Sequence, residues 1–592
     1  MPVYKAPVAD VMFLLEDVLE IGRYSGLPGF EDVSADTVRA ILVEGARLCE
    51  AVLQPLNASG DREGCHRAED GSVTTPKGFR EAYEAYRAGG WIGLPVPTAF
   101  GGLGLPAVLN AVMQEFASGA NLAFGMYPGL TQGAIAALLE HGSDEQKATY
   151  LPKMVSGEWS GTMNLTEPHC GTDLGLIRTR AAKQPDGSYR LSGQKIFISA
   201  GEHDLTDNIV HLVLARIEGA PAGTKGISLF VCPKFLVGAD GTIGARNAVT
   251  CGKIEEKMGI HANATCVMNY DGASAWLVGE ENRGLPAMFV MMNEARLAVG
   301  VQGLAVGEAA YQNAAAYAKE RLQGRALTGA KQADKPADPI IVHPDVRRML
   351  MTVRALNEGG RALMLETALQ ADIHRRAADE ATRRAADDRL GLMTPIVKAM
   401  LTENGLRGAI ESQQVFGGHG YVAEVGVEQF VRDARITLIY EGANGIQALD
   451  LVGRKLPKDG GRAMMAYLGE LQAFLGRHAA DEALKPHIDP LKVSAGHLQQ
   501  ATMWLMQNAL GKPDNAGAAS TDYLHLFGLV ALGHMWARMA KAALAKGDDP
   551  LARAKLVTAR FFAERLLPET GLRLARVSAG AGGVMALPAE MF

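Results

Sequence analysis

The spacing of hydrophobic residues along this 592-residue chain changes twice. From residue 40 to 160 apolar side chains recur every three or four positions, as in ADTVRAILVEGARLCEAVLQPL, which predicts helices. From 161 to about 283 the segments are short, alternating and β-branched, as in GSYRLSGQKIFISAG, which predicts strands. Helical spacing returns over 284–456 and persists over 457–592. Because the strands are grouped together, we expect a compact antiparallel sheet or barrel between helical domains.

These changes of period also predict where domains begin and end. We expect a helical extension over 1–40, a helical domain over 41–160, a β-barrel domain over 161–283, a helical bundle over 284–456 and an additional helical domain over 457–592. Polar segments with proline or glycine predict breaks between helices at 328–340, 511–520 and 546–550. The charge-rich stretch 373–389 predicts a solvated helix face.

Composition narrows the class of protein. Hydrophobic residues make up 48% of the chain and charged residues 21%, as in soluble globular proteins. The net charge of -6 gives no electrostatic reason to expect nucleic acid or an anionic membrane as a partner. The six cysteines form no Cys-x-x-Cys pair, which favours a reducing compartment. We find neither an export signal nor an apolar run long enough for a membrane span, so we expect a cytoplasmic protein.

A single carboxylate, Glu441, follows the apolar run 436–440 and precedes a flexible Gly-Ala-Asn-Gly segment. A Glu-Gly pair is ordinarily a solvated turn. Here, however, no Lys or Arg occurs between Arg435 and Arg454 to pair with the acid. Apolar neighbours desolvate a carboxylate and raise its pKa, which suits it to general-base catalysis near neutral pH. We therefore treat Glu441 as a candidate catalytic base.

The loop GTMNLTEPHCGTDLGLIRTR, residues 161–180, is a second candidate because it gathers hydroxyls and small residues. Such a loop offers backbone N–H groups and hydroxyls to a planar polar ligand or to phosphates. It has neither of the glycine spacings of the common nucleotide-binding fingerprints. His169, Cys170 and Asp173 have side chains that ligate metals, but no second cluster completes a site, and we expect no metal.

Arginines and glycines supply the remaining candidates. Arg296 lies on a helix of small and apolar residues, and Arg321 and Arg325 lie near a helix end. Surface ion pairs or the helix dipole would also explain these arginines. The turn SQQVFGGHGY, residues 412–421, has three glycines within four positions, which is more than a helix cap needs. Its backbone can approach a phosphate or an adenine closely.

The order of these motifs is more specific than any one of them. LTEPHCGTD, KIFISAG, EARLAVGVQG, ERLQGR, QQVFGGHGY and IYEGANGIQ resemble the successive motifs of the acyl-CoA dehydrogenase family over about residues 40–456. The resemblance implies a mostly α, α+β chain: a helical domain, a central β-barrel and a four-helix C-terminal bundle, followed here by an additional helical domain. It also implies α,β-dehydrogenation of an acyl-CoA to a trans-2-enoyl-CoA, with FAD as cofactor and electron transfer flavoprotein as acceptor.

The resemblance also implies roles for individual residues. Glu441 would remove the α-proton of the thioester, with its own backbone N–H helping to stabilise the thioester oxygen, and Arg296 would lie beside this base. The residues implied in FAD binding are Leu165, Thr166, Thr172, Phe197, Ile198, Ser199, Arg321, Gln414, Gly417 and Gly418. The residues implied in substrate binding are Thr172, Asn293, Arg296, Tyr440, Glu441 and Gly442.

Four positions depart from the family pattern. His169-Cys170 replaces a small pair after the Thr-Glu-Pro motif, and Phe197 stands where tryptophan is common. Gly324-Arg325 replaces Phe-Gly, and Asn293 replaces an aspartate that contacts CoA in the family. None of these departures involves Glu441, so the expected chemistry is unchanged.

The extra length of the chain resembles a longer bacterial subgroup of the family, which includes enzymes for 3-methylthiopropionyl thioesters. The segments TEPHCGTD and KPADPIIVHPDVRRML are similar to that subgroup. We therefore expect this substrate, with a general medium- or long-chain fatty acyl-CoA as the alternative. An added helical domain in long-chain relatives covers a surface that tetramers use, so we expect a homodimer.

Three rival interpretations remain open from the sequence. A DNA-associated flavoprotein of the same fold would need a basic tail, but residues 457–592 carry 15 Lys and Arg against 12 Asp and Glu. An acyl-CoA oxidase would carry out the same half-reaction with oxygen as acceptor, and the motifs do not separate the two. A helical scaffold without activity would carry Glu-Gly by coincidence and would bind no FAD.

Overall fold

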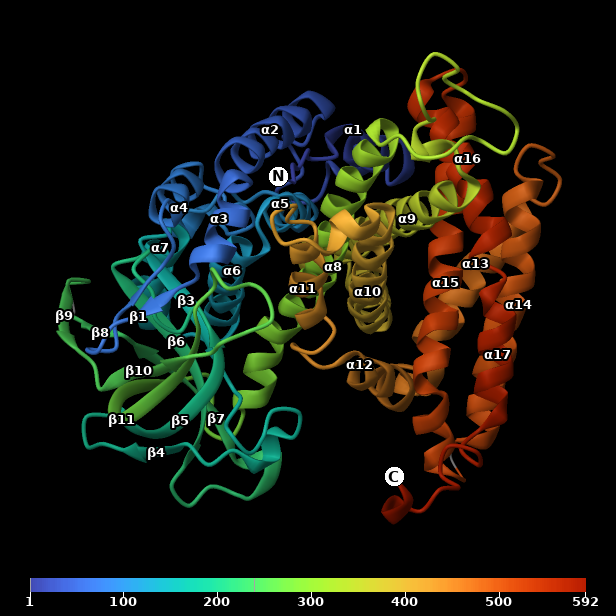
Figure 1. The fold of residues 1–592 in the computed structure, drawn as a ribbon. Helices are drawn as coiled ribbons and strands as arrows, with labels where there is room; N and C mark the ends of the chain where they lie inside the picture. The colour runs from blue at the N-terminus through green and yellow to red at the C-terminus, as the bar shows by residue number, and fades with distance from the viewer. Residues whose placement is uncertain (1, 239, 510) are drawn as a thin grey trace. The chain divides into compact units, whose positions relative to one another are not determined.

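The computed structural model describes residues 2–238, 240–509 and 511–592 (Figure 1). It contains two compact units, one of residues 44–298 and the other of residues 1–43 together with 299–592. The first unit contains the strands, and the second contains the long helices and the N-terminal extension. The predicted succession of helices, strands and helices is confirmed.

Helices precede the strands, as their apolar spacing predicts. These are α2 (Ala35–Leu48), α3 (Pro55–Glu63), α4 (Phe79–Ala88), α5 (Ala107–Ala120), α6 (Leu122–His141) and α7 (Asp144–Val155). Ser143 and Gln146 form a reciprocal capping box that fixes the start of α7. A small hairpin, β1 (His66–Arg67) with β2 (Val73–Thr74), interrupts this helical region, which the periodicity did not predict.

The helix α6 is long and apolar enough to cross a membrane, but 72% of its most apolar window is buried inside the protein. It packs on β3 (Trp159–Asn164) and α5. Thr131 of α6 illustrates this packing, because its hydroxyl accepts a hydrogen bond from the backbone N–H of Gly161 at 3.1 Å. An apolar helix buried in this way is a core helix of its unit.

The strands of the middle region close into a barrel, which Figure 1 shows in green and teal. The strands are β3, β4 (Arg180–Lys183), β5 (Tyr189–Ser199), β6 (Asn208–Ile217), β7 (Ile227–Pro233), β10 (Val249–Ile254) and β11 (Thr265–Val278), with β8 (Phe235–Val237) and β9 (Ile243–Arg246) pairing separately. The ring runs from β11 to β5, β4, β6 and β7, and β7 pairs with β11 again. The expected barrel is thus confirmed.

The barrel is not purely antiparallel, because β3 and β4 both run parallel to β6. Parallel pairing cannot be made with a tight hairpin and needs a longer connection. β3 and β4 lie on either side of β6, so residues 165–179, which connect them, have to cross from one side of β6 to the other. The same loop carries the Thr-Glu-Pro motif, so an irregular crossover of the barrel forms one of the candidate sites.

The second unit is built of long helices (orange to red at its C-terminal end in Figure 1). They are α1 (Val8–Phe13), α8 (Gly284–Glu320, which begins in the first unit), α9 (Pro344–Arg376), α10 (Glu380–Val415), α11 (Glu428–Ile436), α12 (Asn444–Asp450), α13 (Arg462–Arg477), α14 (Lys485–Asn508), α15 (Pro513–Ala545), α16 (Pro550–Arg565) and α17 (Glu569–Ala579). Gly303 and Gly405 let α8 and α10 cross closely, because a Cβ on Gly405 would lie 2.0 Å from the carbonyl oxygen of Gly303.

Two predictions, one of a helix face and one of a break, differ from the structure. The charge-rich stretch 373–389 contains the end of α9 and the start of α10, where Asp379 caps the backbone N–H of Thr382. It is therefore a helix–turn–helix, and not a single helix face. The predicted break 511–520 lies mostly inside α15, because Pro513 is at the first turn of that helix, where its fixed φ favours helix formation.

The additional C-terminal helices are anchored on the bundle by Trp536 of α15, which is 1% exposed. Its indole N–H donates to the carbonyl oxygen of Ala355 on α9 at 3.1 Å. A Cβ on Gly359 would lie 2.6 Å from the indole nitrogen, so only glycine leaves room for the ring. The helices after residue 456 therefore share a core with the bundle.

A buried ionic cluster also joins the N-terminal extension to the bundle and to the additional helices. Lys555 of α16, fully buried, contacts Asp10 of α1 and lies 2.7 Å from Glu358 of α9. Arg361 lies 2.5 Å from Asp10 and 3.2 Å from Glu308 of α8. Burial raises the pKa of Asp10, but the charges and hydrogen bonds of Lys555 and Arg361 outweigh it and hold that pKa below its ordinary value. Four helices are thus linked by charges removed from water.

We expect Lys555→Met to destabilise the protein by about 3–5 kcal/mol, because it leaves buried carboxylates without one of their cations. Because the pKa of Asp10 is lowered in the folded state, its contribution to stability is present above the unfolded-state value and disappears as the pH falls. Urea unfolding of wild type and variant measures both effects. Lys492→Met, at an exposed position on α14, is the control and should change stability by under about 0.5 kcal/mol. Equal stability of the two variants would contradict a linking role for Lys555.

Candidate functional site

Glu441, the predicted base, lies between α11 and α12 with a left-handed backbone. Its φ is +55° and that of the following Gly442 is +84°. This conformation costs a non-glycine residue on the order of 1–3 kcal/mol and persists only where the surroundings impose it. Such strain is concentrated at functional sites, so the backbone supports the candidate independently of its motif. The side chain is partly buried.

Asn444, three residues after Glu441, fixes this turn to helix α10. Its side-chain oxygen accepts a hydrogen bond from the fully buried Lys398 ammonium at 2.8 Å. Its side-chain nitrogen donates to Thr402 Oγ1 at 3.0 Å and to Glu403 Oε1 at 3.1 Å. Its backbone N–H donates to the carbonyl oxygen of Leu438 at 3.1 Å. One amide side chain thus holds the turn against three residues of a long helix.

Glu403 extends this network to the additional C-terminal helices. Its second carboxylate oxygen contacts Nε2 of His525 on α15. The other ring nitrogen of His525 lies 2.9 Å from the carbonyl oxygen of Thr521, which can only accept. Burial raises the pKa of Glu403, but the hydrogen bonds from His525 and Asn444 and the charges of His525 and Arg573 together outweigh it and lower that pKa. His525 therefore connects α15 to the carboxylate that in turn holds Asn444.

The residues on either side of Glu441 are also held. The Tyr440 hydroxyl donates to the side-chain oxygen of Gln302 on α8. Burial, together with the nearby carboxylates of Glu441 and Asp433, raises the pKa of Tyr440. The side-chain nitrogen of Gln447 donates to the carbonyl oxygens of Glu441 at 3.3 Å and Gly442 at 3.2 Å. The turn is therefore tied to α8, α10 and α12.

The glycine-rich turn follows α10 and lies close to the end of α8. Tyr317 of α8 stacks on Phe416, with ring centroids 4.3 Å apart, and so joins the two. Arg321, one turn beyond Tyr317, is exposed, and Gly417 and Gly418 have open space where a Cβ would stand. A guanidinium and an uncovered backbone therefore lie on one side of the unit. Such a pair suits an anionic phosphate.

Two side chains hold the backbone of these segments in shape. Gln414 is exposed, and it is its neighbour Gln413 that holds the turn, by donating to the carbonyl oxygen of Gly420 at 2.9 Å. Arg325 donates to the carbonyl oxygens of Gln332, at 2.9 Å, and Lys335. Arg325 therefore organises its own loop.

In the barrel unit, the Thr-Glu-Pro loop is fixed by a buried ion pair between Glu167 and Lys195 of β5, at 2.9 Å. Lys195 also donates to the carbonyl oxygen of Leu165 at 2.8 Å. Glu167 accepts further hydrogen bonds from the backbone of Arg178, at 2.6 Å, and from the hydroxyl of Thr179, at 2.6 Å. Burial raises the pKa of Glu167, but the charge of Lys195 and the hydrogen bonds from Thr179, Lys195 and the Arg178 backbone together outweigh it and lower that pKa. This charge pair keeps both ends of an irregular loop in place.

A β-bulge in β5 turns Phe197 outward. Ile198 pairs with Cys266 and Lys195 with Met268, so β5 has one more residue than β11 across this interval. Phe197 has a φ of +58° and is 61% exposed, whereas Ile198 belongs to the barrel core. A bulge is a common means of redirecting a side chain next to a site. Phe197 can thus cover a flat ligand with its ring, while Ile198 can offer only its backbone.

The other predicted residues of this unit lie on its loops and on α8. Thr166 is partly buried, and its carbonyl oxygen accepts from the backbone of Ile196 at 2.9 Å; Ser199 is also partly buried. Thr172 is exposed on the Thr-Glu-Pro loop. Arg296 is 7% exposed, and its guanidinium lies 3.5 Å from the side-chain oxygen of Asn293, one turn earlier on α8.

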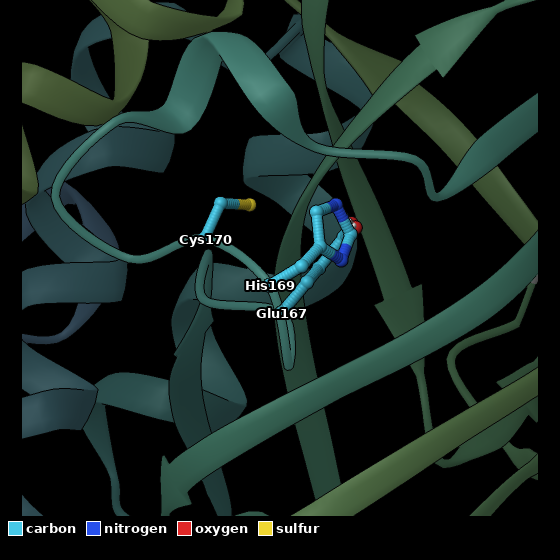
Figure 2. Close-up of side chains that lie close together, drawn as sticks. All are labelled: Glu167, His169 and Cys170. Carbon is cyan, nitrogen blue, oxygen red and sulfur yellow. Dashed lines mark ion pairs between the residues drawn. The ribbon is translucent and has the colours of Figure 1, made fainter.

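Glu167, His169 and Cys170 lie together on one loop, as Figure 2 shows, with potential ligand atoms within 4.8 Å of one another. The carboxylate of Glu167 is already used by Lys195, Thr179 and the Arg178 backbone. His169 Nε2 lies 2.9 Å from the carbonyl oxygen of Leu176 and so acts as a donor there. A cation would meet the buried Lys195 ammonium, so this cluster is better explained as part of the loop's support than as a metal centre.

Sequence patterns did not reveal the residues that support the site. Lys398, Glu403 and His525 are each more than 40 positions from Asn444, and nothing in the periodicity links them. Asn444 lies within the IYEGANGIQ motif, and this position is the one feature of the sequence that could have indicated its role in supporting Glu441.

Comparisons with known proteins agree with this architecture. Family models match successive parts of the chain: acyl-CoA dehydrogenase N-terminal domain over 39–158, middle domain over 162–273, C-terminal domain over 282–456, and acetyl-CoA dehydrogenase C-terminal like over 467–588. Among solved structures, Caenorhabditis elegans ACDH-11 in complex with C11-CoA has a TM-score of 0.78 at 19% identity, covering 96% of this chain and 92% of its own. An acyl-CoA dehydrogenase of Bacillus anthracis complexed with FAD has a TM-score of 0.76 at 21% identity, covering 92% and 88%.

Sequence relatives match over nearly the whole length. The 3-methylmercaptopropionyl-CoA dehydrogenase of Ruegeria pomeroyi is 44% identical over 97% of this chain and 98% of its own. A broad-specificity linear acyl-CoA dehydrogenase of Mycobacterium tuberculosis is 36% identical over 95% and 96%. A butyryl-CoA dehydrogenase of Syntrophomonas wolfei is 32% identical over 100% and 99%. The chain therefore belongs to the acyl-CoA dehydrogenase family, the flavoenzymes that use FAD to oxidise the bond between the α- and β-carbons of an acyl-CoA.

Proposed function

We propose that this protein converts 3-methylmercaptopropionyl-CoA to its trans-2-enoyl thioester, with Glu441 as the base that removes the α-proton. The observation that carries the assignment of the base is the strained backbone of Glu441, held by Asn444, Gln447 and the buried Lys398. The choice of substrate is supported by the Ruegeria relative, which is similar over nearly its entire length, including the additional helices.

A general linear acyl-CoA is the second candidate substrate. The Mycobacterium and Syntrophomonas relatives also span nearly the whole chain, and their names specify linear acyl-CoA and butyryl-CoA. The two candidates share the thioester and the α- and β-hydrogens, so the proposed role of Glu441 is the same for both. They differ only in the group attached to the β-carbon.

The residues present fit FAD. Arg321 and the open turn at Gly417 and Gly418 offer positive charge and backbone to the phosphates. In the barrel unit, exposed Phe197 offers a ring face, and the fixed Thr-Glu-Pro loop offers Leu165 and Thr166. We assign the first group to the nucleotide part of FAD, with Arg321 reaching the pyrophosphate of an FAD on a neighbouring subunit, and the second group to the isoalloxazine part. Bound FAD supplies the acceptor for the hydrogen that leaves the β-carbon with its electron pair.

The chain's own part in the reaction is to position the thioester and to move a proton. Glu441 accepts the α-proton on its carboxylate, and its backbone N–H donates to the thioester oxygen, where negative charge develops. Asn444 and Gln447 prevent the turn from relaxing to an unstrained backbone. Thr172, Asn293, Arg296, Tyr440 and Gly442 are the remaining residues that we assign to the substrate.

We assign electron transfer flavoprotein as the acceptor, a cytoplasmic location and a homodimeric assembly. Oxygen consumption during turnover would instead identify an oxidase, and anaerobic titration with electron transfer flavoprotein separates the two. The balanced charge of residues 457–592 disfavours a DNA-associated role.

Glu441→Gln should retain FAD and bind acyl-CoA, but lose reduction of the flavin by at least roughly 10⁴-fold, because the amide cannot accept the α-proton. Anaerobic stopped-flow bleaching of the flavin measures this rate. Glu564→Gln makes the same chemical change at an exposed position on α16 and should bleach at the wild-type rate. Bleaching by Glu441→Gln at the wild-type rate would remove Glu441 from the mechanism.

His525→Ala should lower kcat on the order of tenfold to a hundredfold with little change in KM, because Glu403 and Asn444 then hold the catalytic turn less firmly. His525→Gln keeps a donor for Glu403 and should restore much of the rate. Steady-state kinetics with a dye acceptor provides both constants. An unchanged kcat in His525→Ala, or equal loss in both variants, would show that the contact does not position the turn.

A panel of butyryl-, octanoyl-, palmitoyl-, phenylpropionyl- and 3-methylthiopropionyl-CoA tests the substrate assignment by dye reduction. We expect the highest kcat/KM for 3-methylthiopropionyl-CoA. A tenfold or greater preference for a linear chain, about 1.4 kcal/mol in transition-state binding, would assign the second candidate and leave the role of Glu441 intact.

A further inference from the structure

A cavity of about 1060 Å³ lies within the helical unit, apart from the residues assigned to catalysis. It is lined by residues 17–24 of the N-terminal extension and by α9, α10, α13 and α15. Arg389 of α10 lines the cavity, and Thr402 of the same helix contacts Asn444. The two residues are 13 positions apart, which is about 20 Å along a helix that rises 1.5 Å per residue. Gln414 is about 38 Å from Arg389 by the same measure. The cavity is therefore distinct from the catalytic turn and from the proposed nucleotide turn.

The cavity has an excess of positive charge without partners. Arg389 and Arg462 in its wall are paired with Glu470 and Asp388. Arg477, Arg538 and Lys541 make no ion pair with a carboxylate anywhere in residues 2–238, 240–509 and 511–592; Arg538 donates only to the carbonyl oxygen of Val18, at 3.0 Å, and to a methionine sulfur. Arg477 and Lys541 are exposed and Arg538 is half-buried, and all three line one cavity. Several cations without carboxylate partners are the arrangement that multivalent anions bind.

Two buried polar side chains also face the cavity. Tyr467 is 3% exposed, and within the described part of the chain its hydroxyl has no hydrogen-bond partner. His534 is 6% exposed and packs against Phe474, with ring centroids 4.9 Å apart. Burial and the charges of Arg538, Arg389 and Arg477 lower the pKa of His534 to about 3, so its ring is neutral. A buried hydroxyl left without a partner is costly unless a ligand or water satisfies it.

The other residues that line the cavity indicate what the non-phosphate part of a ligand would be. Leu369, Ile373 and the ring of Phe474 give an apolar surface, which suits a flat ring. Glu20 and Glu366 lie on the same cavity; Glu20 lies 3.5 Å from Arg23 and Glu366 accepts from Gln370 at 3.4 Å, and their remaining oxygens can accept hydrogen bonds from amino or hydroxyl groups. Pockets for ligands of drug size are about 300–1,000 Å³, so the volume accommodates a nucleotide.

We propose that this cavity is a second ligand site, which binds an anionic small molecule combining phosphate groups with a heteroaromatic ring. Adenine nucleotides and the nucleotide end of CoA share this chemistry. Arg477, Arg538 and Lys541 bind the phosphates, and the Tyr467 hydroxyl and neutral His534 hydrogen-bond the rest of the ligand.

Calorimetric titration of the FAD-loaded protein with ADP, 3′-phospho-ADP, inorganic phosphate and adenosine tests this site. We expect saturable ADP binding that weakens at least roughly tenfold in Arg538→Gln/Lys541→Gln, which removes two unpaired cations. Lys492→Gln/Arg553→Gln makes the same charge change on exposed parts of α14 and α16 and should bind as wild type. Tighter binding of 3′-phospho-ADP than of ADP would identify the nucleotide end of CoA, and the reverse a free nucleotide.

Tyr467→Phe provides a second arm that does not depend on the charged variants. It removes one hydroxyl that has no partner in the described chain, so folding should be unaffected while ADP binding weakens several-fold. Absence of ADP binding at millimolar concentration, binding unchanged in both cavity variants, or adenosine binding as tightly as ADP would each overturn the proposal.

Discussion

The hydrogen bonds of a single amide, Asn444, determine whether Glu441 can remain in a conformation that a glutamate otherwise avoids. A left-handed backbone at a non-glycine residue is unfavourable, and only rigid surroundings keep it populated. Asn444 provides this rigidity because its three partners on α10 include a buried ammonium, Lys398, which itself needs an acceptor. A buried charge that needs a partner thus holds the turn that carries the proposed base.

In the barrel unit, too, a buried ammonium holds an irregular segment in place. There the buried ammonium is Lys195, and the irregular segment is the Thr-Glu-Pro loop that connects two parallel strands. Glu167 anchors the loop, and the adjacent bulge turns Phe197 outward. In each unit a buried lysine on a helix or strand, Lys398 on α10 or Lys195 on β5, binds an irregular segment. Such a segment has no regular backbone hydrogen bonds of its own to fix its conformation. The additional C-terminal helices take part as well, through His525 and Lys555.

Periodicity predicted the helices and the barrel because each follows from which face of an element is buried. It did not predict the parallel pairing of β3 and β4 with β6, since pairing depends on how a loop crosses the barrel and leaves no repeat in the chain. For the candidate site, motif order pointed to Glu441 as the proposed base, whereas the contacts of Lys398, Glu403 and His525 join residues dozens of positions apart. The hydrogen bonds by which Arg325 and Gln413 hold their own segments likewise leave no pattern in the sequence.

The central claim, that the Glu441 carboxylate takes a proton from the α-carbon, is tested most directly by hydrogen exchange in deuterium oxide. 3,3-Dimethylbutyryl-CoA has α-hydrogens and no β-hydrogens, so it can lose a proton reversibly but cannot be oxidised. If Glu441 is the base, the FAD-loaded wild-type protein catalyses deuterium incorporation at the α-carbon, seen by mass spectrometry, and the Glu441→Gln variant does not. Equal incorporation by both proteins would contradict the claim.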